Sequence, residues 1–217
     1  MKYMFQSFIK KLSEEIKTEL PGFSAHNLMA HLGRDVLAKY SSNDKIPKKS
    51  AVLILLFPDK SGHFVRTSFI LRSVIERGSH GGQVAFPGGG MELTDADLGY
   101  TALRETEEEI GVKKDSISLI GMLTPVYIPV SNYMVHPYIG VVDSEPEFIL
   151  DPQEVAGIIT CSLNDLIHPE NKTKITKYVK IVDCELEIPC YKIEGKVIWG
   201  ATAMIISELE QLLLRVK

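Results

Sequence analysis

Apolar residues at helical spacing mark both ends of the chain. Near the start they recur every three or four residues, which predicts an amphipathic helix that ends near Pro21. These positions are Phe5, Phe8, Ile9, Leu12 and Ile16. A second helix is predicted over about 25–39, and a polar segment follows it at 41–45. At the far end, residues 203–216 predict a closing helix with its leucines on one side.

Between these helices the pattern is typical of strands. Short apolar or alternating runs predict strands at 51–57, 64–71, 83–86, 117–126, 133–142 and 155–161. A short capped helix is predicted at 162–167, and residues 175–198 alternate like a β-meander that carries several lysines. Mixed strands around one central helix, closed by a C-terminal helix, predict an α+β sandwich. The first helices then form an N-terminal helical extension over 1–47, ahead of a domain over 48–217.

The segment 104–112, Arg-Glu-Thr-Glu-Glu-Glu-Ile-Gly-Val, is rich in glutamate and contains a single arginine. On a helix that turns about 100° per residue, Glu105, Glu108 and Glu109 lie within one arc, and Glu107 points almost the opposite way. Like charges three and four residues apart repel each other on a bare helix. With no Lys or Arg between them, the three carboxylates are expected to need an external cation. Hard oxygen ligands favour Mg²⁺ or Mn²⁺.

The surroundings of this acidic segment decide between two interpretations. Glutamate-rich helices are usually solvated surfaces, and this is the alternative to a metal site. Thr94 followed by Asp97 predicts the helix start, as a near relative of a capping box, and Gly111 predicts its end. A small, mostly apolar stripe at helical spacing consists of Gly99, Leu103, Thr106 and Ile110. A helix that packs this stripe, just after a Gly-rich loop at 86–90, favours metal ions held against an anionic ligand.

Length, charge and cysteine content narrow the class of protein. With 217 residues the chain can build one sizeable core, or at most two small domains. The net charge of −4 argues against a general nucleic-acid binder, which would show a basic excess. The 3 cysteines have no C-x-x-C spacing, so we expect reduced structural thiols rather than disulfides or a zinc site. We recognise no signal peptide, and the longest apolar run, 51–57, is too short to span a bilayer, so a cytoplasmic protein without a membrane partner is predicted.

Taken together, the glycines, arginine and glutamates of this region resemble the Nudix box, G-x5-E-x7-R-E-U-x-E-E-x-G-U with U apolar. The matching residues are Gly90, Arg104, Glu105, Glu108, Glu109, Gly111 and Val112. Two positions differ from the pattern, because Ala96 stands at the first glutamate and Thr106 at the first apolar position. In the family that glutamate usually pairs with the arginine, so Asp95 or Asp97 could replace it beside Arg104, which the resemblance implies as a catalytic residue.

The resemblance implies the Nudix-type α/β/α sandwich with a mixed sheet, and hydrolysis of a diphosphate bond that links a nucleoside to another group. Diphosphate oxygens complete the coordination of Mg²⁺ or Mn²⁺ that the carboxylates leave open. By their i,i+4 spacing Glu105 and Glu109 are expected to be the principal ligands, with Glu108 bridging or binding through water. The resemblance adds the carbonyl of Gly89 as a further oxygen ligand, and Glu154 as a ligand or general base.

A second resemblance, upstream of the box, narrows the substrate. Residues 71–77 and 82–89 are similar to L-L-T-x-R-S-x3-R-x3-G-x-V-x-F-P-G-G, a motif of the coenzyme A pyrophosphatase branch, with a changed start and one extra residue before Gly82. Segments 127–133 and 199–203 also resemble this branch. Coenzyme A carries a 3′-phosphate that needs fixed cations, for which two arginines are the candidates. The alternatives are that Arg72 pairs with Glu76 and that Arg77 is an exposed residue without a role. The implied substrate contacts are Arg72, Arg77, Gly88 and Gly89.

The leading hypothesis is a metal-dependent diphosphatase that cuts coenzyme A or a close derivative into adenosine 3′,5′-bisphosphate and 4′-phosphopantetheine. One alternative is cleavage of another nucleoside diphosphate derivative, such as ADP-ribose, NADH or a dinucleoside polyphosphate. The other is a non-catalytic Nudix-like module that senses nucleotides. Such modules commonly lose a carboxylate of the Arg-Glu-x-x-Glu-Glu core, which is complete here. The sequence is compatible with a homodimer but is silent on oligomeric state.

Overall fold

The computed structural model describes residues 2–30, 46–74, 81–179 and 183–216. Its main feature is an eight-stranded sheet in which β3, β2, β1, β7 and β5 follow one another, while β4 pairs with β1, β6 with β7 and β8 with β2. These strands are β1 (Lys48–Pro58), β2 (Val65–Arg72), β3 (Val84–Ala85), β4 (Gly88–Gly90), β5 (Ser118–Met122), β6 (Val126–Ile128), β7 (Tyr133–Val141) and β8 (Val155–Ser162). Strands β1 and β7 run parallel and the other pairs run antiparallel, so the predicted mixed sheet is confirmed.

Two stretches of this sheet differ from the sequence prediction. The single strand predicted over 117–126 is interrupted, since β5 ends at Met122 and β6 begins at Val126. Pro125 lies in the interruption, and a proline has no amide hydrogen to donate to a sheet. The glycine-rich segment, predicted as a loop, instead forms the short strand β4 along β1. Three consecutive glycines carry little strand propensity, which is why the pattern alone did not indicate this pairing.

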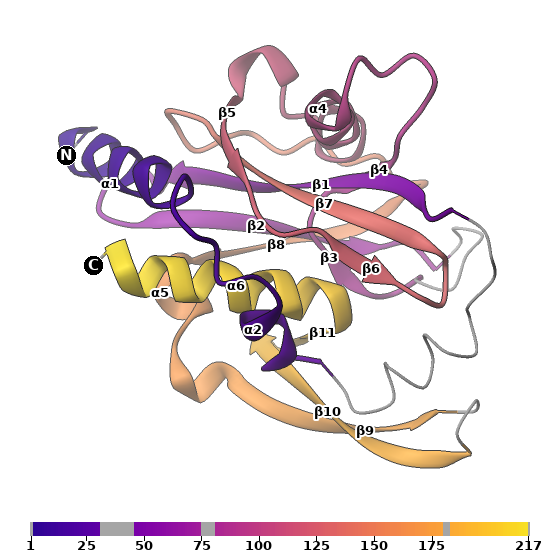
Figure 1. Ribbon diagram of the computed structural model, residues 1–217. Coiled ribbons are helices and arrows are strands. Elements are labelled where there is room, and N and C mark those ends of the chain that lie inside the picture. Colours follow the sequence, from indigo (N-terminus) through magenta and orange to yellow (C-terminus); the bar gives the residue numbers. More distant parts are fainter. Residues whose placement is uncertain (1, 31–45, 75–80, 180–182, 217) are drawn as a thin grey trace.

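Helices cover both faces of the sheet. They are α1 (Lys2–Glu15), α2 (Gly22–Asn27), α4 (Leu98–Ile110), α5 (Leu163–Leu166) and α6 (Gly200–Val216), with 3₁₀ turns at Lys114–Ser116 and Pro169–Asn171. Figure 1 shows α4 on one face of the sheet and α6 on the other, which confirms the predicted α/β/α layers. The helix predicted over 25–39 begins earlier, at Gly22, and α2 ends at Asn27, so the prediction is wrong for 28–30; residues 31–39 lie outside the described ones. Among the described residues, no helix is long and apolar enough to cross a membrane.

Strand β1 contributes to the core on both sides of the sheet, because its uninterrupted apolar run places side chains on both faces. Leu53, Leu55 and Phe57 are fully buried in one cluster with residues of α4. Ile54 and Leu56 are fully buried in the other cluster, with residues of α6. The position of β1 thereby fixes α4, and the acidic residues on it, against the sheet.

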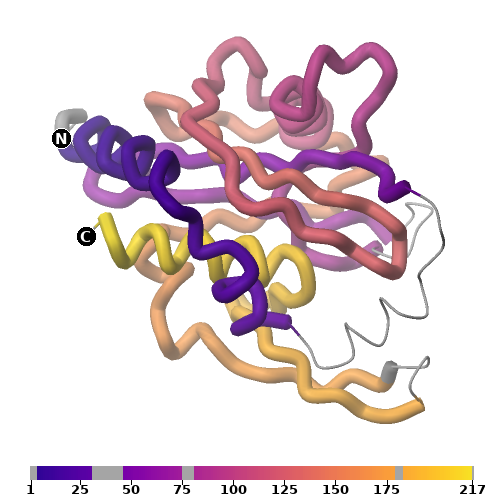
Figure 2. Tube along the Cα trace, viewed as in Figure 1, coloured from indigo at the N-terminus to yellow at the C-terminus, as the bar shows by residue number. Residues whose placement is uncertain are grey.

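The first helix packs on the last one. Phe5 and Leu12 of α1 share a buried cluster with Leu209 of α6. At the surface Arg215 lies 3.2 Å from the carboxylate of Glu15. Figure 2 shows the indigo start and the yellow end of the chain side by side. The N-terminal helices therefore pack into the same core as the sheet and the C-terminal helix.

A second, three-stranded sheet lies beyond α6, on the side away from α4 (Figure 1). It consists of β9 (Lys172–Val179), β10 (Cys184–Ile193) and β11 (Lys196–Trp199), which pair antiparallel in the order β11-β10-β9. The β-meander predicted over 175–198 is confirmed. Because β11 leads directly into α6, this sheet is attached to the helix that covers the main sheet.

Candidate active site

Glycines allow β4 to lie between β1 and α4. A Cβ atom at Gly88 would lie 2.2 Å from the carbonyl oxygen of Ala51, and the backbone φ of 148° at Gly88 also favours glycine. A Cβ atom at Gly89 would lie 2.5 Å from the carboxylate of Glu105. The amide of Gly88 donates a hydrogen bond of 2.7 Å to the carboxylate of Glu109. Backbone without side chains is therefore brought directly against two carboxylates of α4.

Helix α4 is capped at both ends. The carboxylate of Asp97 accepts from the amide of Tyr100 at 2.8 Å, so Asp97 is the N-cap. The helix start predicted at Thr94 is wrong, because the backbone of Asp97 is extended, with φ of −160°, and the helix begins only after it. Gly111 ends the helix as predicted, in the left-handed conformation with φ of 73°, and its amide donates to the carbonyl of Glu107 at 3.0 Å.

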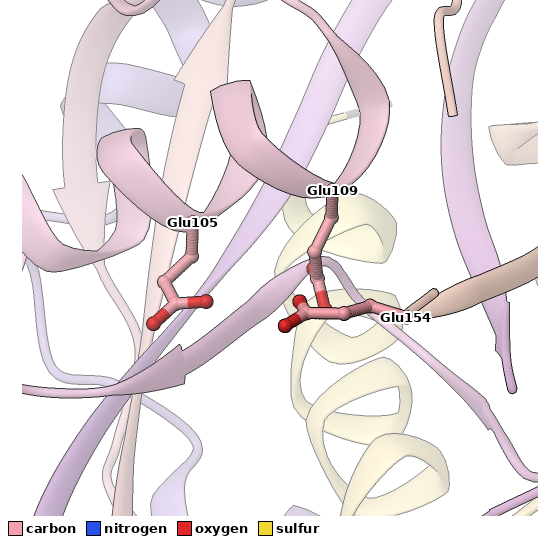
Figure 3. A group of neighbouring side chains, drawn as sticks. All are labelled: Glu105, Glu109 and Glu154. Carbon is pink, nitrogen blue, oxygen red and sulfur yellow. The ribbon is translucent and has the colours of Figure 1, made fainter. Parts of the chain in front are cut away.

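Three carboxylates from two segments meet beside β4. Oxygen atoms of Glu105, Glu109 and Glu154 lie within 4.8 Å of one another, and we call these residues the glutamate cluster. Figure 3 shows Glu105 and Glu109 pointing the same way from successive turns of α4, with Glu154 reaching toward them from a different segment. Glu105 and Glu109, four residues apart on α4, thus form one group with Glu154, which lies 45 positions beyond Glu109 in the sequence.

Backbone hydrogen bonds hold Glu154 at this place. The amide of Asp151 donates to the carbonyl of Glu109 at 3.1 Å, which ties the segment before β8 to the end of α4. The amide of Ser73 donates to the carbonyl of Glu154 at 2.8 Å, which ties the same segment to the end of β2. The side chain of Glu154 is exposed, so it contributes the solvent-facing carboxylate of the cluster.

Glu109 is the buried member of the cluster, with 2% of its surface exposed. Its pKa is raised to about 8, mainly by burial, and the charges of Glu105 and Glu154 act in the same direction. The amide of Gly88 and the charge of Arg72 act in the opposite direction. Burial likewise raises the pKa of Glu105. These carboxylates repel one another in a poorly solvated place, and a bound cation would relieve that repulsion.

Arg104 links the cluster to the segment before α4. Its Nε and Nη2 donate to the carboxylate of Asp95 at 2.9 and 3.1 Å, and Nη2 also donates to Glu105 at 3.0 Å. Arg104 lowers the pKa of Asp95 to about 2. Of the two aspartates beside Ala96, it is therefore Asp95 that pairs with the arginine, while Asp97 caps the helix.

The other two glutamates of the acidic segment lie outside the cluster. The carboxylate of Glu108 is 55% exposed and accepts from Nη1 of Arg104 at 2.7 Å. The expectation that no cation stands among the three carboxylates of the stripe is therefore corrected, since Arg104 contacts both Glu105 and Glu108. Glu107 points away, as expected, and pairs with Lys113 at 3.0 Å.

A cleft of about 720 Å³ opens between the end of β2 and the second sheet. The three glutamates are not part of its lining, but the amide of Ser73, which is, donates to the carbonyl of Glu154. Ser73 and Pro152, which lie next to Glu154 in space or sequence, form part of its lining. Lys177 and Lys196 line it from the second sheet. Sequence reasoning gave these lysines no role, although the lysine-containing meander was visible. A smaller recess of about 440 Å³ includes Gly90, the last residue of β4, in its lining.

The predicted substrate contacts are partly described. Arg72 ends β2 and lines the large cleft, where its charge acts on the nearby Glu109. Gly88 and Gly89 form β4, directly against the cluster. Arg77 lies outside the described residues. The structure therefore brings one of the two arginines and both glycines to the same place as the three carboxylates.

The residues of this site fit a divalent metal ion. The cluster offers hard oxygen ligands only, of the kind that Mg²⁺ and Mn²⁺ prefer. A carboxylate as buried as that of Glu109, with two others close by, would be stabilised by a bound cation. At Gly89 the backbone passes the carboxylate of Glu105 with no side chain in between. The arrangement is suited to holding a cation against an anionic ligand in the adjoining cleft.

Known proteins resemble this chain. A model of the NUDIX domain matches residues 47–180. A protein named uncharacterized Nudix hydrolase NudL from Shigella boydii is 35% identical over 130 residues, which is 60% of this chain and 66% of that protein. Its namesake from Yersinia pestis is 34% identical over 132 residues, 61% of this chain and 65% of that protein. The matches thus span just under two thirds of the length of these relatives.

Solved structures with a similar fold share little sequence. A MutT/nudix family protein from Enterococcus faecalis aligns with a TM-score of 0.48 at 17% identity, over 88% of this chain and 76% of that one. The Nudix hydrolase RenU from M. smegmatis aligns with a TM-score of 0.46 at 17% identity, over 57% of this chain and 78% of that one. Within this chain, the family match includes the whole glutamate cluster, whereas β10, β11 and α6 lie beyond it.

Proposed function

The chain belongs to the Nudix family, and on this premise we propose that it hydrolyses the diphosphate bond of a nucleoside diphosphate derivative with the help of a divalent cation. One observation carries the proposal: the carboxylates of Glu105, Glu109 and Glu154 converge beside a large cleft. The complete Arg-Glu-x-x-Glu-Glu core supports catalysis rather than nucleotide sensing alone.

We assign the metal to the glutamate cluster, together with the backbone of Gly89. A bound Mg²⁺ or Mn²⁺ would neutralise phosphate charge and make a water molecule more acidic. Glu105 and Glu109 supply the fixed ligands, because α4 and β4 hold them rigidly. Glu154, which is exposed, serves as the third ligand or as the base that takes a proton from water.

Arg104 is the positioning residue of this proposal. Its bonds to Asp95 anchor the guanidinium, and its bond to Glu105 holds that carboxylate toward the cluster. Glu108 steadies Arg104 from the solvent side, and we propose that it contacts the metal through water. Replacing Asp95 would therefore disturb Glu105 indirectly, through the loss of the arginine's orientation.

The finer proposal is that the substrate is coenzyme A or a close derivative. Its support is the motif resemblance at 71–77 and 82–89 and the position of Arg72 in the cleft. The products would be adenosine 3′,5′-bisphosphate and 4′-phosphopantetheine. We further propose that residues 48–217 form the catalytic domain and that 1–47 are a helical extension, of which α1 packs on α6.

The test is product analysis with the purified full-length chain. Coenzyme A, dephospho-coenzyme A, ADP-ribose, NADH and diadenosine polyphosphates are incubated with Mg²⁺ or Mn²⁺, with EDTA as the blank. We expect metal-dependent cleavage, fastest for coenzyme A, and none in EDTA. Glu105→Gln serves as the inactive control, because it removes a ligand charge and keeps the shape of the side chain.

Two results would change the assignment. Faster cleavage of ADP-ribose than of coenzyme A would overturn the coenzyme A proposal and leave a general diphosphatase. If none of these substrates is cleaved with either metal while nucleotides still bind, the chain is a sensing module and the proposed activity is wrong.

A further inference from the structure

One face of the second sheet is turned toward the large cleft. On β9 the alternating residues Ile175 and Lys177 line the cleft, and on β11 the alternating residues Val197 and Trp199 do so. The intervening Lys174 of β9 pairs with Glu187 of β10 instead. Because side chains alternate between the two faces of a strand, Lys177 and Trp199 belong to the cleft face and Lys174 to the opposite one.

The cleft is cationic. Its lining contains Arg72, Lys177 and Lys196, and no aspartate or glutamate among the described residues that form it. The chain as a whole carries a net charge of −4, so this lining departs from the general balance. Three positive charges that line one cleft create a potential that attracts anions.

Lys177 is held in place without being neutralised. Its Nζ lies 3.8 Å from the centroid of the Trp199 ring, a cation–π contact that fixes the ammonium over the indole. Within the described part of the chain it forms no ion pair with a carboxylate. Partial burial lowers its pKa, which reflects a cation that has lost some of its water. An incoming anion would therefore meet a fixed and incompletely solvated charge.

Arg72 and Lys177 stand at different places along the cleft. Arg72 ends β2 and its charge lowers the pKa of Glu109, so it lies at the end occupied by the glutamate cluster. Lys177 belongs to the separate sheet that forms the other wall. A diphosphate bound at the cluster would use Arg72, and a ligand that extends along the cleft would reach Lys177 with a more distant group.

We propose that Lys177, positioned by Trp199 and supported by Lys196 at the rim, binds a phosphate group of the substrate other than the diphosphate that is cleaved. The assignment rests on the proposed function and deepens it, since it makes the second sheet the part of the protein that distinguishes substrates with an additional phosphate. Lys177 lies just inside the family match, which ends at 180, whereas Lys196 and Trp199 lie beyond it.

Binding of nucleotides tests this without any catalytic step. Isothermal titration calorimetry on the full chain would compare adenosine 3′,5′-bisphosphate with adenosine 5′-phosphate. The wild type should bind the bisphosphate about 10- to 100-fold more tightly, as expected for one charge-assisted contact. Lys177→Met, which keeps an apolar stem against Trp199, should remove most of that preference and leave the affinity for the monophosphate unchanged.

Two variants control for shape and for charge. Lys174→Met removes the same charge from the opposite face of β9 and should keep the preference. Lys177→Arg retains a cation at the proposed position and should keep most of it, which makes the experiment informative even if Lys177→Met folds poorly. In hydrolysis assays, Lys177→Met should raise KM for coenzyme A about 10- to 100-fold and leave dephospho-coenzyme A nearly unaffected.

Three outcomes would overturn the proposal. The first is a wild type that binds the two nucleotides equally well. The second is a Lys177→Met variant with the wild-type preference, and the third is a variant that loses affinity for both nucleotides by the same factor. Failure of the proposed function looks different, because the wild type would then cleave no diphosphate, whatever its binding preference.

Discussion

Two glutamates of this protein are almost equally buried, yet they stand in opposite surroundings. Glu109 is 2% exposed and Glu208 on α6 is 0% exposed. Glu109 accepts a hydrogen bond of 2.7 Å from the amide of Gly88 and lies near two other carboxylates. Glu208 accepts a hydrogen bond of 2.9 Å from Nε2 of His26, and further hydrogen bonds from two other residues. Hydrogen bonds and nearby charge compensate the burial of Glu109 only in part, whereas they outweigh the burial of Glu208.

The donors of Glu208 come from the N-terminal region and from the middle of the chain. The amide of Gly22 donates at 3.0 Å, and the amide and hydroxyl of Thr124 donate at 3.1 and 2.6 Å. Burial raises the pKa of Glu208, but the hydrogen bonds from His26 and Thr124 outweigh it, so the pKa lies below its usual value. In Glu109 burial prevails and the pKa rises to about 8.

This difference indicates that Glu208 stabilises the fold, whereas Glu109 is suited to binding a cation. A buried anion with a full set of donors stabilises the native chain, and its removal leaves those donors unpaired. A buried anion beside other anions costs stability until a cation arrives. We therefore expect substitutions at the two sites to have opposite signatures, activity at one and stability at the other.

The largest effect is expected at the glutamate cluster. Glu105→Gln and Glu109→Gln should each lower kcat by about 10²–10⁴-fold, because each removes charge from a proposed metal ligand. At a pH above about 8, where Glu109 is ionised, thermal unfolding of the metal-free variants should be unchanged or shifted upward, since a neutral amide relieves the repulsion. Steady-state kinetics with unfolding curves measure both. A lower midpoint together with the loss of activity would indicate a structural role instead.

Glu208→Ala should give the reverse signature. Breaking a buried, hydrogen-bonded pair costs about 3–5 kcal/mol, which for a chain of this size lowers Tm by about 6–20 °C. The kcat of the folded fraction should stay near that of the wild type. Glu14→Ala, on the exposed surface of α1, is the matched control and should leave Tm unchanged. A Tm within 2 °C of the wild type for Glu208→Ala would mean that the buried network contributes little.

The stability of the metal-free protein should depend on pH through the ionisation of Glu109. The folded pKa of Glu109, about 8, lies above the ordinary 4.5, so the metal-free native state holds a proton that the unfolded state has lost. The stability that this proton contributes is fully present below pH 4.5 and is lost as the pH rises to about 8. Between these values the difference in unfolding free energy between wild type and Glu109→Gln should fall by about 1.4 kcal/mol per pH unit at most.

Denaturant titrations in EDTA between pH 5 and 8.5 measure this slope. Saturating Mg²⁺ or Mn²⁺ should abolish it in the wild type, because binding to the anionic form offsets the repulsion. A flat difference between the two proteins in EDTA would show that Glu109 is already ionised in the metal-free state.

The sequence predicted part of the glutamate cluster but not the hydrogen-bond network of Glu208. The i,i+4 spacing of Glu105 and Glu109 is a local property of one helix, so the pattern predicted their common side. Glu154 joins them through backbone bonds to α4 and β2, which no local pattern contains, and only the family resemblance indicated it. The network of Glu208 unites segments near residues 26, 124 and 208 and was missed.

A signal for that network did exist. Glu208 lies three residues after Ile205 and one before Leu209, within the apolar stripe of the closing helix. A charged residue on such a stripe is buried, and burial requires partners. Which partners it finds depends on how α2 and the β5–β6 junction reach α6, and this arrangement comes from tertiary packing. For the same reason the sequence left Asp95 and Asp97 as equal candidates for Arg104, until the capping bond assigned Asp97 to the helix start.

The smallest effect is expected at Glu107, which makes it the sharpest control for the comparison. It lies on the same helix as the cluster, but its carboxylate points away and pairs with Lys113 and Lys114 at 3.0 and 3.4 Å. Glu107→Gln removes the same unit of charge as Glu105→Gln, two residues away. We expect kcat within about twofold of the wild type and a stability loss of about 0.2–1 kcal/mol, as is usual for exposed ion pairs.

Measured side by side, the Glu107→Gln and Glu105→Gln variants separate the effect of charge at the cluster from the effect of charge on the helix as a whole. Should Glu107→Gln be as inactive as Glu105→Gln, the side of α4 to which we assign the metal would be wrong.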